Sequence, residues 1–232
     1  MWGIKTEENG VVSIKSYETL MNPTDSISTR MTRRARVGIV SFDFDGTLTN
    51  YFELASAEGV KTFSRDMYVL RECLRLMKEF EDLDKVYLSL NTNEGRTQVL
   101  EKAFANIFTA DTPWLVPGLN FLAGSVRSYC PQTYQMSEPL DFGNLYKRTH
   151  KLTKLEEFAL MRAADEELIS VTHIEDGKDY DETSFAALNE VSVNNYIVNL
   201  PQHAGRAQML AALRATAIAR QVKERDTQYS AH

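Results

Sequence analysis

The chain has 232 residues, which is enough for one sizeable globular domain and a small accessory element. Its apolar content of 43% and charged content of 25% are those of an ordinary globular protein. A net charge of −6 argues against a protein that coats nucleic acid, because such proteins present a basic surface. The two cysteines, Cys73 and Cys130, are too few for a disulfide scaffold.

The sequence shows neither a secretory signal nor a membrane span. Residues 1–8 lack a basic region followed by an apolar core. No run approaches the roughly 20 apolar residues that a membrane helix needs. We therefore expect a cytoplasmic protein, with secretion by a signal-less route as the alternative.

Residues 1–35 are polar and irregular, and we interpret them as an N-terminal extension of a domain that spans 36–232. Glu8-Asn9-Gly10 before the apolar residues 11–14 predicts a short hairpin. An arginine cluster then precedes the first long apolar run; its members are Arg30, Arg33, Arg34 and Arg36. A solvated lead-in is the favoured interpretation of this cluster, and a phosphate-steering or anionic-partner patch is the alternative.

Strands and helices alternate through the rest of the chain. Apolar runs predict strands that begin at Val37 and near residues 86, 114, 169 and 195. Apolar residues at helical spacing predict helices over about 66–82, 96–107, from Thr153 onward, and 203–225. Cys73 lies on the apolar stripe of the first helix, so we expect it in the core. This alternation predicts an α/β fold with a mostly parallel sheet and helices on both faces.

The segment 113–150 is rich in Gly, Pro, Tyr and Ser and is a candidate for a small cap or insert. Its tyrosines, Tyr129, Tyr134 and Tyr146, are expected to pack against apolar neighbours, with stacking on a nucleic-acid base as the alternative.

The first strand ends in two acids. Asp43 and Asp45 lie on the same side of an extended chain, because side chains alternate with a period of two. Two carboxylates held so close repel each other, and their burial is costly unless a cation compensates. The pair therefore indicates chemistry, and a turn in which the acids only cap backbone N–H groups is the alternative.

The run Asp43-Phe44-Asp45-Gly46-Thr47 resembles the DxDGT signature of the haloacid dehalogenase (HAD) superfamily, in its phosphatase branch. The resemblance implies a three-layer Rossmann-like fold. It implies that Asp43 is a nucleophile that accepts a phosphoryl group and that Asp45 is a general acid and base. Mg²⁺ would bridge the site, held by Asp43, Asp45 and a later acid, with Gly46 and Thr47 near the phosphate.

The other parts of the site are expected at later strand ends, where ligands of parallel sheets bind. Thr92 resembles the hydroxyl residue of the second family motif, with Ser89 as runner-up, and Asn93 and Arg96 are candidate phosphate contacts. The lysine of the third motif has three candidates, of which Lys154 is preferred; the others are Lys151 and Lys147.

The acidic segment after the fourth strand resembles the fourth motif. Asp176 is the expected metal ligand, or Glu175 if the register differs by one residue. Asp179 or Asp181 would supply the later acid. His173 is interpreted as a packed histidine within the strand.

These residues predict a Mg²⁺-dependent phosphomonoester hydrolase that works through an aspartyl-phosphate on Asp43. An Asp at position 45 supplies the proton shuttle that phosphatases and phosphomutases need. The alternatives are a phosphotransferase or mutase of the same superfamily and a catalytically silent binding module. A small cap leaves the site open, which suits a phosphoprotein or a nucleic-acid end. The segments Thr153–Phe158 and Ile174-Glu175-Asp176 also resemble HAD domains associated with RNA repair, without settling the substrate.

Overall fold

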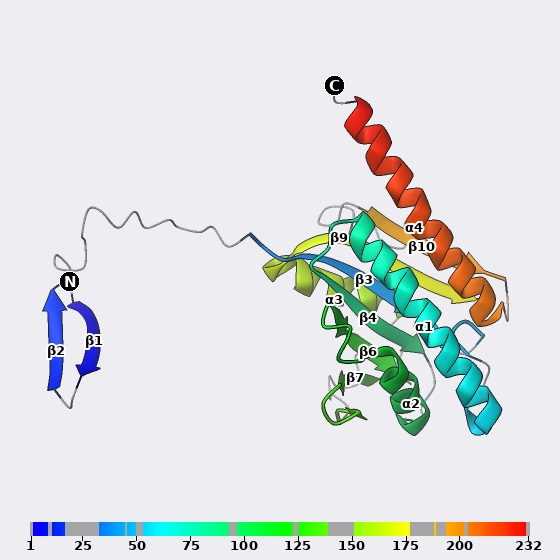
Figure 1. Cartoon of the computed structure of the whole chain (residues 1–232), viewed down its shortest axis with the longest axis horizontal. Coiled ribbons are helices and arrows are strands. Elements are labelled where there is room, and N and C mark those ends of the chain that lie inside the picture. Colours follow the sequence, from blue (N-terminus) through cyan, green and yellow to red (C-terminus); the bar gives the residue numbers. More distant parts are fainter. Residues whose placement is uncertain are drawn as a thin grey trace. The chain divides into compact units, whose positions relative to one another are not determined.

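The computed structural model divides the chain into two compact units, residues 1–33 and 34–232 (Figure 1). The structure describes residues 2–8, 11–16, 33–44, 46–49, 53–92, 97–122, 125–138, 151–176, 188, 194–201 and 204–230. Some residues inside these ranges, among them Thr92 and Lys151, are described by their backbone alone.

The first unit contains a two-stranded antiparallel hairpin of β1 (Trp2–Glu8) and β2 (Val11–Ser16). Glu8 pairs with Val11, so the two strands flank residues 9–10. The predicted hairpin is confirmed.

The second unit is built on one sheet with the strand order β10-β9-β3-β4-β6-β7-β8, and β5 also pairs with β4. The pairs from β10 through β3 to β4, and those of β4 with β5 and β6, are parallel; β6, β7 and β8 continue the sheet in antiparallel pairs. The strands are β3 (Arg36–Phe42), β4 (Lys85–Thr92), β5 (Leu115–Pro117), β6 (Leu119–Leu122), β7 (Ser125–Cys130), β8 (Gln135–Met136), β9 (Glu167–Asp176) and β10 (Asn194–Leu200).

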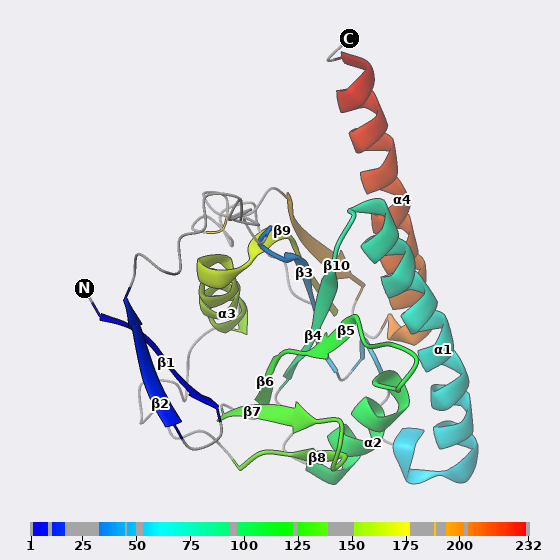
Figure 2. The same cartoon turned by 60° about the vertical axis from the view of Figure 1, so that its left-hand side comes forward.

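Helices cover both faces of this sheet (Figure 2). They are α1 (Ala57–Phe80), α2 (Thr97–Ile107), α3 (Lys151–Asp165) and α4 (Gly205–Ser230), and a 3-10 turn, Glu53–Ala55, precedes α1. Alternate residues of β3 divide between the faces: Val40 and Phe42 belong to the core under α1, α2 and α4, whereas Ile39 belongs to the core under α3. The predicted α/β class, with a parallel sheet between helices, is confirmed.

Several element boundaries differ from the sequence prediction. α1 begins at Ala57 rather than near residue 66, because Ser56 caps it and accepts a hydrogen bond from the Gly59 N–H at 3.0 Å. α3 begins at Lys151 rather than near Thr153. β9 continues to Asp176, so the predicted acidic pair lies in the strand itself.

The described part of the predicted insert, residues 113–138, extends the sheet as β5 to β8. Tyr129 is buried and stacks on Phe104 and Phe108, with ring centroids 5.0 and 5.5 Å apart. Its predicted packing role is confirmed. Tyr134 is exposed, and Tyr146 lies outside the described residues.

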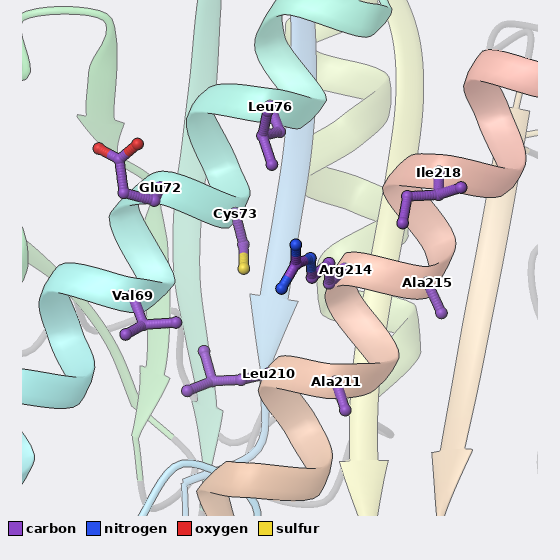
Figure 3. Close-up of a pocket in the computed structure, with 9 residues that line it drawn as sticks. All are labelled: Val69, Glu72, Cys73, Leu76, Leu210, Ala211, Arg214, Ala215 and Ile218. Atoms are coloured by element: carbon purple, nitrogen blue, oxygen red, sulfur yellow. The ribbon is translucent and has the colours of Figure 1, made fainter.

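An apolar groove of about 540 Å³ lies between α1 and α4 (Figure 3). The Cys73 thiol and the Arg214 guanidinium point toward each other across it. Cys73 is buried as expected, and burial raises the pKa of its thiol. None of the helices among the described residues is long and apolar enough to cross a bilayer.

Candidate active site

The predicted motif forms a compact turn at the carboxyl end of β3. The Leu48 and Thr49 N–H groups both donate to the Phe44 carbonyl oxygen at 3.0 Å, and the Gly46 N–H donates to the Thr49 carbonyl oxygen at 2.9 Å. Gly46 has φ +82°, a conformation that favours glycine. The sequence therefore closes a tight loop directly after the strand, between β3 and α1.

Asp176 reaches this turn from the end of β9. The Thr47 hydroxyl donates to Asp176 Oδ1 at 3.2 Å. A Cβ atom placed on Gly46 would stand 2.5 Å from Asp176 Oδ2, so a side chain here would require the carboxylate to shift. Two motifs that are 129 residues apart in sequence are thus in direct contact.

Asp43 continues the β3–β9 ladder one residue beyond the strand. Its N–H donates to the Ile174 carbonyl oxygen at 2.9 Å, which places Asp43 in register with Glu175. The pair before it in the register is Ser41 with His173. Because paired residues of parallel strands share a face, these four side chains lie on the face that α3 covers.

The acids and the histidine on this face are buried. Asp43 is 7% exposed and Glu175 is 1% exposed. His173 Nε2 lies 3.0 Å from Glu175 Oε2, so the histidine contacts its strand neighbour inside the protein. The buried position of His173 agrees with the expected packed histidine. Glu175 is in register with Asp43 and is therefore its neighbour on this face.

Lys154 lies near the start of α3. The helix ends at Asp165 and β9 begins at Glu167, so α3 runs back along the strand and begins near the carboxyl edge of the sheet. Lys154 is only 6% exposed, and its Nζ donates to Glu157 Oε2 at 2.9 Å. A lysine buried to this degree on the face of Asp43 differs from the solvated charge of an ordinary surface lysine.

Several predicted site residues lie outside the described residues: Asp45, Asn93, Arg96, Lys147, Asp179 and Asp181. Thr92 ends β4, but its side chain, like that of Lys151, is not described. The runner-up Ser89 is fully buried, and its hydroxyl has no hydrogen-bond partner among the described residues. Ser89 therefore stays the runner-up for the hydroxyl of the second motif.

Two arginines of the predicted basic cluster lie at the opposite edge of the sheet. Arg34 donates to carbonyl oxygens at the end of α3, including that of Ala163 at 2.9 Å. Arg36 begins β3 and pairs with Asp82 at 2.8 Å. The phosphate-steering alternative is wrong for these two residues, because they lie at the end of β3 opposite Asp43.

Three residues that the sequence analysis did not single out form a charged cluster beside the motif turn: Arg206, Glu53 and Asp66. Arg206, in the first turn of α4, donates to the Leu48 carbonyl oxygen and to the carboxylates of Glu53 and Asp66. No local motif links these positions, because they come from three separate elements. Only the fold brings them together.

Two described acids could contribute ligands to a divalent cation at the carboxyl edge of the sheet. Asp43 and Asp176 provide carboxylate oxygens, the ligands that Mg²⁺ prefers, and Gly46 leaves the space that the Asp176 carboxylate occupies. Within the described part of the chain, no three acidic, histidine or cysteine side chains gather as a metal-binding group. Asp45, the third predicted ligand, is not in that part.

Comparison of the chain with protein-family models, curated proteins and solved structures found no match. The fold and the site define an α/β protein whose buried acids lie at the carboxyl edge of a parallel sheet.

Proposed function

We propose that the chain is a Mg²⁺-dependent phosphomonoester hydrolase that forms an aspartyl-phosphate on Asp43. One observation carries this proposal: the contact of Asp176 with Gly46 and Thr47. It joins the two motifs that supply the nucleophile and the metal ligand in the family that the sequence resembles. A turn in which the acids only cap backbone groups gives no reason for a second, distant carboxylate to lie there.

The proposed chemistry assigns one task to each residue. Asp43 attacks phosphorus, while Asp45 donates a proton to the leaving oxygen. Asp45 then takes a proton from water, which hydrolyses the aspartyl-phosphate. Asp43, Asp45 and Asp176 would hold Mg²⁺, which would supply positive charge to neutralise the phosphate. Lys154 supplies a second positive charge on the face of Asp43.

The substrate class is proposed from the part of the predicted insert that the structure describes. Residues 113–138 extend the sheet edge instead of forming a separate enclosing domain. A site that these residues leave open would favour a macromolecular phosphate, such as a phosphoprotein or a nucleic-acid end, over an enclosed metabolite. A phosphotransferase or mutase would use the same residues and pass the phosphoryl group to a second substrate.

Release of inorganic phosphate from p-nitrophenyl phosphate with Mg²⁺ tests the reaction class. We expect Asp43→Asn to abolish turnover and EDTA to remove it reversibly. Asp111→Asn is the matched control, because Asp111 is an exposed acid far along the chain from the motifs. Full turnover in Asp43→Asn, or activity unchanged by EDTA, would contradict the assignment.

A panel of phosphopeptides, oligonucleotide ends, nucleotides and sugar phosphates then tests the substrate class. We expect a higher kcat/KM for macromolecular phosphates than for small metabolites. Transfer of labelled phosphate to an added acceptor, with little inorganic phosphate released, would identify the phosphotransferase instead. Binding of phosphate compounds without any turnover would identify the silent module.

A further inference from the structure

The Arg206 side chain lies where α4, the start of α1 and the motif turn meet. It is 8% exposed. Its Nη1 atom lies 2.7 Å from Glu53 Oε2, and its Nη2 atom lies 2.5 Å from Glu53 Oε1. Its Nε atom donates to Asp66 Oδ2 at 3.0 Å. The guanidinium also stands over the Phe63 ring, 5.1 Å from the centroid, so all three of its nitrogens and one flat face are in contact with neighbouring groups.

Arg206, Glu53 and Gly205 contact the motif turn at three residues, Leu48, Thr49 and Gly46. Arg206 Nη1 donates to the Leu48 carbonyl oxygen at 3.0 Å. The Thr49 hydroxyl donates to Glu53 Oε2 at 2.5 Å. The N–H of Gly205, one residue before the arginine, donates to the Gly46 carbonyl oxygen at 2.7 Å. These bonds hold the backbone that carries Thr47, whose hydroxyl contacts Asp176.

We propose that Arg206 is a positioning residue of the active site, which holds the motif turn through Leu48 and Glu53. This inference rests on the proposed function and deepens it. Arg206 acts through the backbone of residues 46–49 and does not contact the substrate. Its role is to keep the turn closed so that Asp43 and Asp176 stay in place through the reaction.

The chemistry of the site requires arginine. Both Glu53 oxygens lie along one edge of the planar guanidinium, and the Leu48 carbonyl shares one of its nitrogens. A lysine would keep the charge, but a single ammonium cannot span these acceptors from one point. Burial disfavours the charged guanidinium, but the hydrogen bonds to Glu53 and Asp66 outweigh it, and the pKa of Arg206 is raised.

The test compares Arg206→Lys with Arg162→Lys. Arg162 is a matched control, because it also lies over a phenylalanine ring, that of Phe158 at 5.8 Å, and pairs with Glu166 at 3.9 Å. It belongs to α3, on the other face of the sheet. Three quantities are measured in each full-length variant: amide hydrogen exchange over residues 43–49, and kcat and KM with p-nitrophenyl phosphate.

We expect exchange over the turn to be at least tenfold faster in Arg206→Lys, with kcat at least tenfold lower and KM within threefold of the wild type. Arg162→Lys should keep turn exchange within twofold of the wild type. Thr49→Val removes only the hydroxyl donated to Glu53 and should accelerate turn exchange about threefold. If Arg206→Lys fails to fold, the exchange rate of Thr49→Val still tests whether the contact with Glu53 holds the turn.

The inference is overturned if turn exchange stays at the wild-type rate in both Arg206→Lys and Thr49→Val. It is also overturned if Arg162→Lys accelerates the turn equally, because Arg206 would then contribute only general stability. If the wild type hydrolyses no phosphomonoester, the proposed function fails, while the exchange data still decide whether Arg206 holds the turn.

Discussion

Gly46→Ala is the most direct test of the contact between the motif turn and Asp176. The new methyl group would stand 2.5 Å from Asp176 Oδ2, and φ at this position is +82°. A left-handed conformation costs a non-glycine residue roughly 1–2 kcal/mol. Displacement of Asp176 also breaks its hydrogen bond with Thr47, worth about 1 kcal/mol at this partly exposed site. We expect a loss of about 2–3 kcal/mol in the free energy of unfolding.

Gly205→Ala separates the two contributions. Gly205 has φ +75°, and a Cβ atom there would meet nothing within 4 Å. Gly205→Ala should therefore lower the free energy of unfolding only by the cost of the left-handed backbone, roughly 1–2 kcal/mol. Urea unfolding gives both values, and the difference between the variants isolates the Asp176 contact.

The same pair of variants tests the metal site. Gly46→Ala should raise the Mg²⁺ concentration for half-maximal phosphatase activity at least tenfold, because Asp176 must move. Gly205→Ala should leave it within twofold. Equal stabilities and equal Mg²⁺ dependence in the two variants would refute the reasoning that Gly46 is needed to admit the Asp176 carboxylate.

The remaining predictions concern other buried groups. Lys154→Met should lower kcat about 100-fold, because it removes a donor that stabilises negative charge. The control Lys102→Met changes an exposed lysine and should leave kcat unchanged. Steady-state kinetics measure both, and equal kcat values in the two variants would exclude the role of Lys154. Tyr129 is buried, its hydroxyl has no partner among the described residues, and burial raises its pKa to about 12. Tyr129→Phe should therefore be as stable as the wild type or up to about 1 kcal/mol more stable near neutral pH. Because the folded pKa lies above the unfolded one, the contribution of this tyrosine to the stability of the wild type is independent of pH below about pH 10 and falls as the pH rises towards 12. Urea unfolding from pH 8 to 12 checks this, and a wild type that loses no more stability than Tyr129→Phe in this range would contradict it. A thiol reagent should label Cys130 much faster than Cys73, because hydrogen bonds from Thr133 lower the pKa of Cys130 while burial raises that of Cys73; equal rates would refute this ordering.

The elements that the sequence predicted best are those with strong periodicity. The strand before Asp43 and the core stripe of α1 are visible because apolar residues recur at a fixed spacing. The start of α1 was missed, since a single capping serine sets it and the apolar stripe begins later. The end of β9 was also placed too early, because acidic residues at a strand end look like a surface turn when the neighbouring strands are unknown.

The sequence by itself determined the fold class and the acids at the motif turn, because both depend on neighbouring residues along the chain. The tertiary structure decided which distant groups meet that turn. Asp176 contacts Gly46 and Thr47 because β3 and β9 are adjacent and end at the same edge of the sheet. Arg206 reaches the turn because α4 begins beside it, a proximity that no spacing in the sequence encodes.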